Sequence, residues 1–227
     1  MLAIKGLNQF YGESHILWDI SLEAREGSCL CLLGRNGVGK TTLLKTIMGL
    51  LPARSGVIAF RGQDLTRRPA SDRARLGIGY VPQGREIFPL LSVEENLRVG
   101  LRRGAEIPPA IFELFPVLKS MLHRRGGDLS GGQQQQLAIG RALALEPRLL
   151  ILDEPTEGIQ PNIVREIGEI IRRLNREAGI GVLLVEQKLA FARRVAESFC
   201  LMDKGRVVTS GAIEALSQEM VAQHLSV

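Results

Sequence analysis

The chain contains few cysteines and few aromatic residues, and both scarcities exclude classes of protein. Only 3 of its 227 residues are cysteine, too few for a disulfide framework. Cys29 and Cys31 fall within residues 28–33, which read as a buried strand without partner ligands nearby, so we do not expect a Cys-x-Cys metal site. With 4% aromatic residues, the chain also lacks the stacking platform that single-stranded nucleic acid binders use.

Long apolar runs and metal-ligand spacings are missing from the sequence as well. No apolar run reaches the roughly 18–20 uncharged residues of a bilayer-spanning helix, and residues 1–6 do not read as a secretory signal. We therefore expect a soluble, cytoplasmic protein. None of the histidines, His15, His123 and His224, stands at ligand spacing from another, which argues against a metal centre. The net charge of +5 fits nucleic acid, anionic membrane or nucleotide partners and does not choose among them.

The periodicity of the chain predicts one α/β domain with a small inserted lobe. A length of 227 residues suits one such domain, whereas two full domains would be crowded. Strands are expected at residues 2–10, 16–24, 28–33, 56–62, 78–82, 149–152 and 181–185, and a helix from residue 40 to about 51. A later helix carries an apolar core stripe formed by Ile163, Ile167, Ile170, Ile171 and Leu174. This alternation predicts mixed sheets, including a parallel sheet covered on both faces.

The lobe is expected where strand signals vanish, from residue 84 to about 146. Ser92 and Glu95 have the spacing of a capping box, which marks the start of a helix. Apolar residues then recur at helical spacing, namely Ile111, Phe112, Leu114, Phe115 and Leu118. We therefore assign residues 84–148 to a helical subdomain and residues 1–83 and 149–227 to a catalytic core.

A glycine-rich loop, residues 34–41 with the sequence GRNGVGKT, stands between an apolar strand and an amphipathic helix. Gly34, Gly37 and Gly39 supply bare backbone, and the helix that follows offers its positive end to anions. Lys40 is expected to reach the β- and γ-phosphates, and Thr41 to ligate Mg²⁺. The sequence therefore predicts a triphosphate-binding loop, to which we also assign Asn36 and Thr42.

Two carboxylates follow an apolar strand further along the chain. Residues 149–152 are apolar, so Asp153 and Glu154 should emerge at the carboxyl end of a buried strand, where ligands of open α/β sheets bind. We expect Asp153 to hold Mg²⁺ through its water shell and Glu154 to act as the general base on the attacking water. Together with the glycine-rich loop, they predict a nucleotide-hydrolysing site.

Between these segments lies a second glycine-rich stretch, residues 129–133 with the sequence LSGGQ, which opens another helix. Ser130, Gly131, Gly132 and Gln133 would place a second helix N-terminus where it can accept phosphate oxygens. One chain already has its phosphate loop at residues 34–41. A second helix N-terminus that can bind phosphate oxygens therefore needs a geometric explanation other than this loop.

The three segments in this order resemble those of ABC ATPases over nearly the whole chain. The resemblance implies a P-loop NTPase core of the RecA-like kind with a mixed sheet, an antiparallel β subdomain and an inserted α-helical subdomain. It also implies that two chains face each other head to tail. ATP would then be clamped between the loop of one chain and Ser130 to Gln133 of the other.

The same resemblance assigns further residues. Gln83 would contact Mg²⁺ and the attacking water, and Tyr11 would stack on adenine, although a core or surface tyrosine is an open alternative. Two positions depart from the family pattern: Gln187 stands where a histidine usually contacts the γ-phosphate, and Gln160 replaces an aspartate. An uncharged amide at Gln187 implies slower hydrolysis or greater dependence on Glu154.

Residues 79–89 and 154–161, together with Gln187, look like the branched-chain amino acid importer subgroup, closest to its urea and short-amide branch. This implies an ATPase using ATP and Mg²⁺, peripheral on the inner face of the cell membrane, that powers uptake of branched-chain amino acids, urea or short amides. Its implied partners are integral membrane permease subunits docked beside Gln83 and the lobe, a second ATPase subunit in a homo- or heterodimer, and indirectly a periplasmic solute-binding protein. No nucleic acid partner is expected.

Two alternatives stay open at this point. The same module could power a lipid or lipopolysaccharide exporter, or it could be a soluble ABC ATPase without a transport role. A small P-loop kinase is excluded, because it would have no use for residues 129–133.

Overall fold

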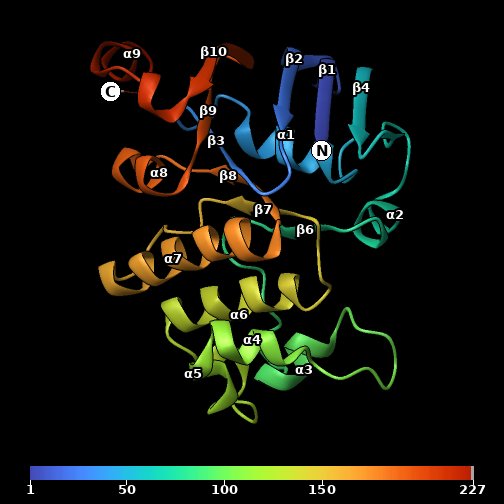
Figure 1. Ribbon diagram of the computed structural model, residues 1–227. Coiled ribbons are helices and arrows are strands. Elements are labelled where there is room, and N and C mark those ends of the chain that lie inside the picture. Colours follow the sequence, from blue (N-terminus) through green and yellow to red (C-terminus); the bar gives the residue numbers. More distant parts are fainter. Residues whose placement is uncertain (226–227) are drawn as a thin grey trace.

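The computed structural model describes residues 1–225, which form two β-sheets and two groups of helices (Figure 1). The smaller sheet is antiparallel, with strand order β2-β1-β4-β5. Its strands are β1 (Leu2–Tyr11), β2 (Ser14–Ala24), β4 (Ser55–Phe60) and β5 (Gln63–Asp64). The larger sheet has the order β10-β9-β3-β8-β7-β6, and all neighbours in it are parallel except β10, which runs antiparallel to β9. The expected mixed-sheet α/β fold is therefore confirmed.

The strands of the larger sheet are β3 (Cys29–Leu33), β6 (Ile78–Val81), β7 (Leu149–Asp153), β8 (Gly181–Val185), β9 (Ser198–Asp203) and β10 (Arg206–Ala212). The helices are α1 (Lys40–Ile47), α2 (Ala70–Arg75), α3 (Val93–Arg98), α4 (Pro109–Leu114), α5 (Pro116–Lys119), α6 (Gly131–Leu143), α7 (Pro161–Ala178), α8 (Leu189–Val195) and α9 (Gln218–His224). Short 3₁₀ turns occupy Gly126–Asp128 and Ile213–Ala215.

The helices between β6 and β7 gather at one end of the molecule, in the lower half of Figure 1. They are α3 to α6, and the capping box expected at Ser92 and Glu95 does open α3. Apart from one isolated bridge between Ser92 and Arg125, the described residues form no strand pairing there. The loss of the strand pattern after residue 84 thus corresponds to a helical segment inserted between two neighbouring strands of the parallel sheet.

The core lies on both faces of the parallel sheet, as the alternation predicted. Along β7, Leu150 and Leu152 pack into the layer of α6, α7 and α8, whereas Leu149 and Ile151 pack toward α1 and the antiparallel sheet. This alternation follows from the two-residue period of a strand. The apolar stripe of α7 joins the first layer, with its members Ile167, Ile170, Ile171 and Leu174 buried and Ile163 partly buried. Both core layers meet at the strands that carry the site.

Helix α1 ends at Ile47, about one turn earlier than expected. The helix ends in a local glycine turn, in which the N–H groups of Gly49 and Leu50 donate hydrogen bonds to the carbonyl oxygens of Thr46 and Lys45 at 3.1 and 2.9 Å. The buried guanidinium of Arg73 in α2 donates further hydrogen bonds to the carbonyl oxygens of Thr46 and Ile47 at 2.9 and 2.7 Å. Gly49 then turns the chain with a φ of 74°. Four elements that follow Gln187 were not predicted from the sequence, namely α8, β9, β10 and α9.

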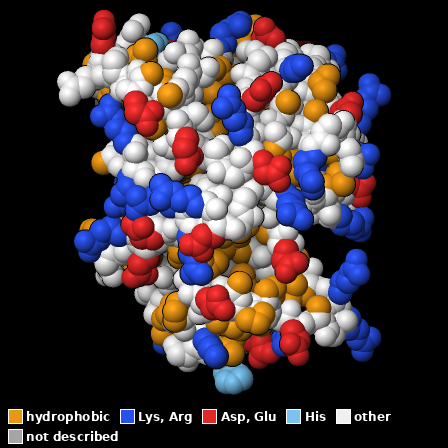
Figure 2. Space-filling model, viewed as in Figure 1, with side chains coloured by type: hydrophobic (Ala, Val, Ile, Leu, Met, Phe, Trp, Pro, Cys, Tyr) orange, Lys and Arg blue, Asp and Glu red, His pale blue; other side chains and the backbone are white. Residues whose placement is uncertain are grey.

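Cationic side chains are spread over the visible surface rather than gathered into one patch, as Figure 2 shows. Hydrophobic side chains gather on the same face over α4, beside an apolar hollow of about 470 Å³ between α4, α6 and α7. Within residues 1–225, no helix has the length and apolar character needed to cross a membrane.

Candidate functional site

The glycine-rich loop joins β3 to α1 and brings backbone close to its neighbours. A Cβ atom on Gly34 would lie 2.6 Å from the carbonyl oxygen of Met202, and one on Gly39 would lie 2.9 Å from Cδ2 of Leu17. Gly39 also precedes α1 with a φ of 103°, a region that L side chains rarely adopt. At Gly37, by contrast, no described atom lies within 4 Å of the added Cβ position. One side of the loop therefore packs against Met202 and Leu17, and the side at Gly37 is open, beside the positive end of α1.

Lys40 lies under this open face with its ammonium group held in place. Its Nζ donates hydrogen bonds of 2.8 Å to the carbonyl oxygens of Gly34 and Arg35, and it lies 3.8 Å from Oε1 of Glu154. Burial lowers the pKa of the lysine, while the charges of Glu154 and Asp153 oppose that shift. The loop thus holds a desolvated cation beside bare backbone N–H groups, which suits a polyanionic ligand.

Asp153 ends β7 and is 2% exposed. Burial raises the pKa of its carboxyl to about 6, the nearby Glu154 charge adds to this, and the Thr41 hydroxyl opposes it. Although Thr41 lies close, neither carboxylate oxygen accepts a hydrogen bond of ordinary geometry from the described residues. A buried carboxylate with unsatisfied oxygens beside a hydroxyl fits the ligand preference of Mg²⁺. The described residues contain no cluster of three or more His, Cys, Asp or Glu side chains that could hold a metal ion.

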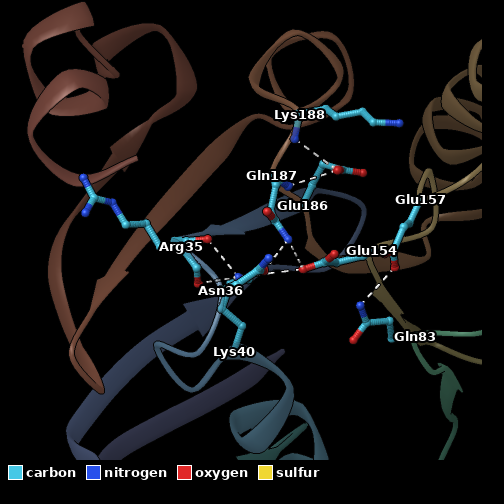
Figure 3. A network of polar contacts seen from close by, with 10 residues as sticks. Arg35, Asn36, Lys40, Gln83, Glu154, Glu157, Glu186, Gln187 and Lys188 are labelled. Atoms are coloured by element: carbon cyan, nitrogen blue, oxygen red, sulfur yellow. Dashed lines mark hydrogen bonds and ion pairs between the residues drawn. The ribbon is translucent and has the colours of Figure 1, made fainter. Parts of the chain in front are cut away.

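Glu154 follows directly, in very different surroundings. Its φ of 49° lies in the left-handed region, which is costly for a non-glycine residue and is found where a side chain is aimed for function. The amide of Gln187 donates 2.6 Å to Oε1 of Glu154 and 2.7 Å to Oδ1 of Asn36 (Figure 3). Gln187 follows β8, so three separate loops meet here: the glycine-rich loop, the turn after β7 and the turn after β8.

Gln83 and Tyr11 are less closely joined to this centre. The Gln83 amide is exposed and donates 2.9 Å to Oε2 of Glu157, which connects the turn after β6 to the turn after β7 (Figure 3). Tyr11 ends β1 opposite Ser14 and is 48% exposed. Among the described residues, no hydrogen bond or ring contact joins Tyr11 to residues 34–42.

The second glycine-rich stretch opens α6 and lies apart from the first. Ser130 accepts a hydrogen bond from the backbone N–H of Gln133, and the Gln133 side chain accepts one from the N–H of Ser130. The first turn of α6 lines a hollow of about 460 Å³ together with Gly158 and Gln160. None of the residues of the described chain that line this hollow belongs to the glycine-rich loop at residues 34–42. A single chain therefore presents two separate glycine-rich helix starts.

Two buried polar residues behind the site were not predicted from the sequence. Thr156 is fully buried and donates a hydrogen bond of 2.8 Å to Oε2 of Glu186, which is itself 3% exposed. The signal was present in the chain, because Glu186 is an acid placed directly after a fully apolar strand and directly before Gln187.

The assembled site combines features that serve one chemistry. Bare backbone and a lysine suit phosphates, a buried carboxylate suits a divalent cation, and a carboxylate that is 11% exposed at the edge of the loop can accept a proton from water. This combination is suited to hydrolysis of a nucleoside triphosphate.

Comparison with known proteins agrees with this chemistry. The model of the ABC transporter family matches residues 17–157. The chain is 42% identical over 213 residues to BraG, a high-affinity branched-chain amino acid transport ATP-binding protein of Pseudomonas aeruginosa, with 92% of this chain and 91% of the relative covered. It is 36% identical to LivF, a probable branched-chain amino acid transport ATP-binding protein of Archaeoglobus fulgidus, with 95% and 94% covered.

Solved structures give the same result. An ABC transporter ATP-binding cassette in its ADP conformation superposes with a TM-score of 0.85 at 27% identity, covering 98% of this chain and 97% of that one. A dimeric bacterial ABC transporter cassette superposes with a TM-score of 0.84 at 26% identity, covering 94% and 99%. The chain therefore belongs to the ABC transporter family and is an ATP-binding ATPase whose hydrolysis of ATP is coupled to transport.

Proposed function

We propose that the chain is the ATPase subunit of an importer that takes up branched-chain amino acids, urea or short amides. The observation that carries this proposal is the 42% identity to BraG across nine-tenths of both chains. An export role has weaker support, since the lipopolysaccharide export ATP-binding protein LptB of Acidithiobacillus ferridurans is 35% identical. Residues 79–89 and 154–161 and Gln187 favour the urea and short-amide branch.

We infer the partners from the same relationship. Integral membrane permease subunits would dock beside Gln83 and the helical subdomain, which we place at residues 84–148, leaving residues 1–83 and 149–227 as the catalytic core. A periplasmic solute-binding protein would deliver the solute to the permease on the other side of the membrane. The chain would thus lie in the cytoplasm, on the inner face of the cell membrane.

The residues of the three loops would bind ATP and catalyse its hydrolysis. The loop from Gly34 to Thr42 and the Lys40 ammonium would hold the phosphates, and Tyr11 would stack on the adenine. Thr41, Asp153 and Gln83 would hold Mg²⁺, which neutralises phosphate charge when bound. Glu154 would accept the proton of the attacking water, with Gln187 holding its Oε1.

A second ATPase subunit completes the proposed site. The start of α6, from Ser130 to Gln133, lines a hollow to which the phosphate loop of the same chain, residues 34–42, contributes no residue. We propose that this end faces the loop of the partner cassette, so that its positive end and N–H groups contact the γ-phosphate from the other side. The partner is a second copy or a related cassette.

Uptake by cells lacking the chain tests the imported solute. The deletion strain is supplied with the wild-type chain or with the Glu154→Gln variant as a matched control, and entry of labelled leucine, urea and acetamide is followed. We expect the wild-type chain alone to restore entry of one of these solutes. Restoration of lipid export without entry of any of the three solutes would overturn the importer proposal.

A further inference from the structure

Glu186 is a buried carboxylate that has no role in the hydrolysis steps proposed above. It follows β8 directly and is 3% exposed, so its charge must be compensated by donors from the protein. Its Oε1 accepts hydrogen bonds from the backbone N–H groups of Gln187 and Lys188 at 2.9 and 3.1 Å. Its Oε2 accepts the hydroxyl of Thr156 at 2.8 Å.

These contacts tie two turns of the chain to each other. Thr156 lies in the turn after β7 and Lys188 in the turn after β8, and β7 and β8 are parallel neighbours in the sheet. The ammonium of Lys188 donates a hydrogen bond of 2.7 Å to the carbonyl oxygen of Thr156, which closes a ring of contacts through Glu186. Only a carboxylate offers two oxygens that can accept these three hydrogen bonds together.

The ring fixes the residue that contacts Glu154. The backbone of Gln187 is held on one side by Glu186, and its side chain points to the other side, toward Asn36 and Glu154 (Figure 3). The backbone of Glu154 is in the left-handed region, and one oxygen of its carboxylate accepts a hydrogen bond from Gln187. The position of this carboxylate therefore depends on that of Gln187. Displacement of a reacting group by about 1 Å can lower a rate on the order of a hundredfold.

We propose that Glu186 and Thr156 are positioning residues for ATP hydrolysis, which hold Gln187 where its amide fixes the Glu154 carboxylate. The inference rests on the role proposed above for Glu154. In this arrangement, Thr156 in the turn after β7 holds Glu186 and thereby Gln187 in the turn after β8. Gln187 in turn holds the carboxylate of Glu154.

Turnover of Thr156 variants tests this inference on the purified protein. Thr156→Val removes the hydroxyl without changing the volume much, and Thr156→Ser keeps it. We expect Thr156→Val to lower kcat roughly tenfold, because one hydrogen bond to a buried charge is lost. The KM for ATP should stay within about twofold, since residues 34–42 are untouched. Thr156→Ser should keep the wild-type kcat.

A double-mutant cycle separates positioning from general damage. In a Gln187→Ala background, Thr156→Val should cause no further loss of kcat, because the side chain through which it acts is already missing. If Thr156→Val lowers kcat by the same factor in both backgrounds, the effect does not pass through Gln187 and the proposal is wrong.

A measurement without turnover distinguishes this proposal from that for Glu154. The side-chain amide signals of Gln187 in an NMR spectrum are identified by their loss in Gln187→Ala. In Thr156→Val they should move toward the positions of a free glutamine, and in Thr156→Ser they should stay. Unmoved signals in Thr156→Val would overturn the positioning of Gln187. Moved signals with unchanged kcat would instead overturn the dependence of hydrolysis on the Gln187–Glu154 contact.

Discussion

Two carboxylates that follow one strand have opposite surroundings at the site. Asp153 is buried with a pKa raised to about 6, whereas Glu154 is partly exposed and held by Gln187 and Lys40. One side chain at the edge of the loop can therefore exchange a proton with water, and the other is enclosed where a cation can satisfy it. The difference in hydrogen-bond partners supports the different roles proposed for these neighbouring residues.

Replacing Glu154 should separate ATP binding from hydrolysis. In Glu154→Gln the phosphate loop and Lys40 are unchanged, but the amide cannot accept a proton. Turnover should fall by about 10²–10⁴-fold while ATP binding persists, and ATP should trap a closed two-chain complex. Nucleotide titration and sedimentation measure these two properties. As a control, Lys40→Ala should weaken nucleotide binding itself, and full turnover by Glu154→Gln would contradict its role as base.

The stability of the nucleotide-free chain should depend on pH through Asp153. Its pKa in the folded chain is raised from 3.8 to about 6, so the folded state binds more protons between these values, and stability falls as the pH rises through this window. Asp153→Asn lacks this titration. Its free energy of unfolding relative to wild type should therefore rise by about 2–3 kcal/mol between pH 4 and pH 8. Urea unfolding at several pH values checks this, and a pH-independent difference would contradict it.

At the scale of elements, the strands and helices near the motifs were predictable, and their ends were less so. The prediction placed β3, β7 and β8 within one residue, because their uninterrupted apolar runs are bounded by polar residues or glycine. Helix α1 was predicted about one turn too long, although Gly49, which turns the chain after it with a φ of 74°, is a local stop signal for a helix. The edge strand β10 is half exposed and carries little apolar signal.

Arg73 should be important for the junction of α1 and α2. Its guanidinium donates to the carbonyl oxygens of Arg68, Thr66, Thr46 and Ile47. Arg73→Met would remove these hydrogen bonds, although the carbonyl oxygen of Thr46 keeps the N–H of Gly49 as a donor, and it should lower the free energy of unfolding by about 2–4 kcal/mol. Arg75→Met on the same helix is the matched control, because Arg75 is 78% exposed. Denaturant unfolding compares the two, and equal losses would contradict this account.

At the scale of the whole molecule, the chain carries the parts of a site without closing it. The phosphate loop contacts the turn after β7 through Lys40 and Glu154, whereas the start of α6 lines a hollow together with Gly158 and Gln160. In the function proposed above, a second cassette closes the site, and one of the similar solved structures is a dimeric cassette.

The shared site can be tested with one bulky substitution. Ser130 is exposed, so Ser130→Arg should cost the cap of α6, about 1 kcal/mol, and leave ATP binding by the isolated chain unchanged. It should abolish turnover, because the long side chain blocks the approach of the partner's nucleotide. Nucleotide titration of the isolated chain and turnover of the assembled protein give the two values. Loss of ATP binding in the isolated chain, or full turnover after assembly, would contradict the shared site.

The sequence by itself determined the parts of the site that depend on neighbouring residues. A phosphate loop requires glycines at fixed short spacing, a strand end requires an apolar run, and a helix start requires a cap, so residues 34–42, 129–133 and 149–154 were identified from local pattern. The same local logic predicted the fold class, since alternating periods favour a parallel sheet covered by helices.

Only the tertiary structure decided which of these parts meet. The contacts of Gln187 with Asn36 and Glu154 join residues 151 and 33 positions apart, and the contact of Thr156 with Glu186 joins residues 30 apart. Such pairs are set by the order of strands in the sheet, which brings the turns after β3, β7 and β8 to one edge. Spacing along the chain carries no information about that order, so the ring behind Glu154 became visible only in the folded molecule.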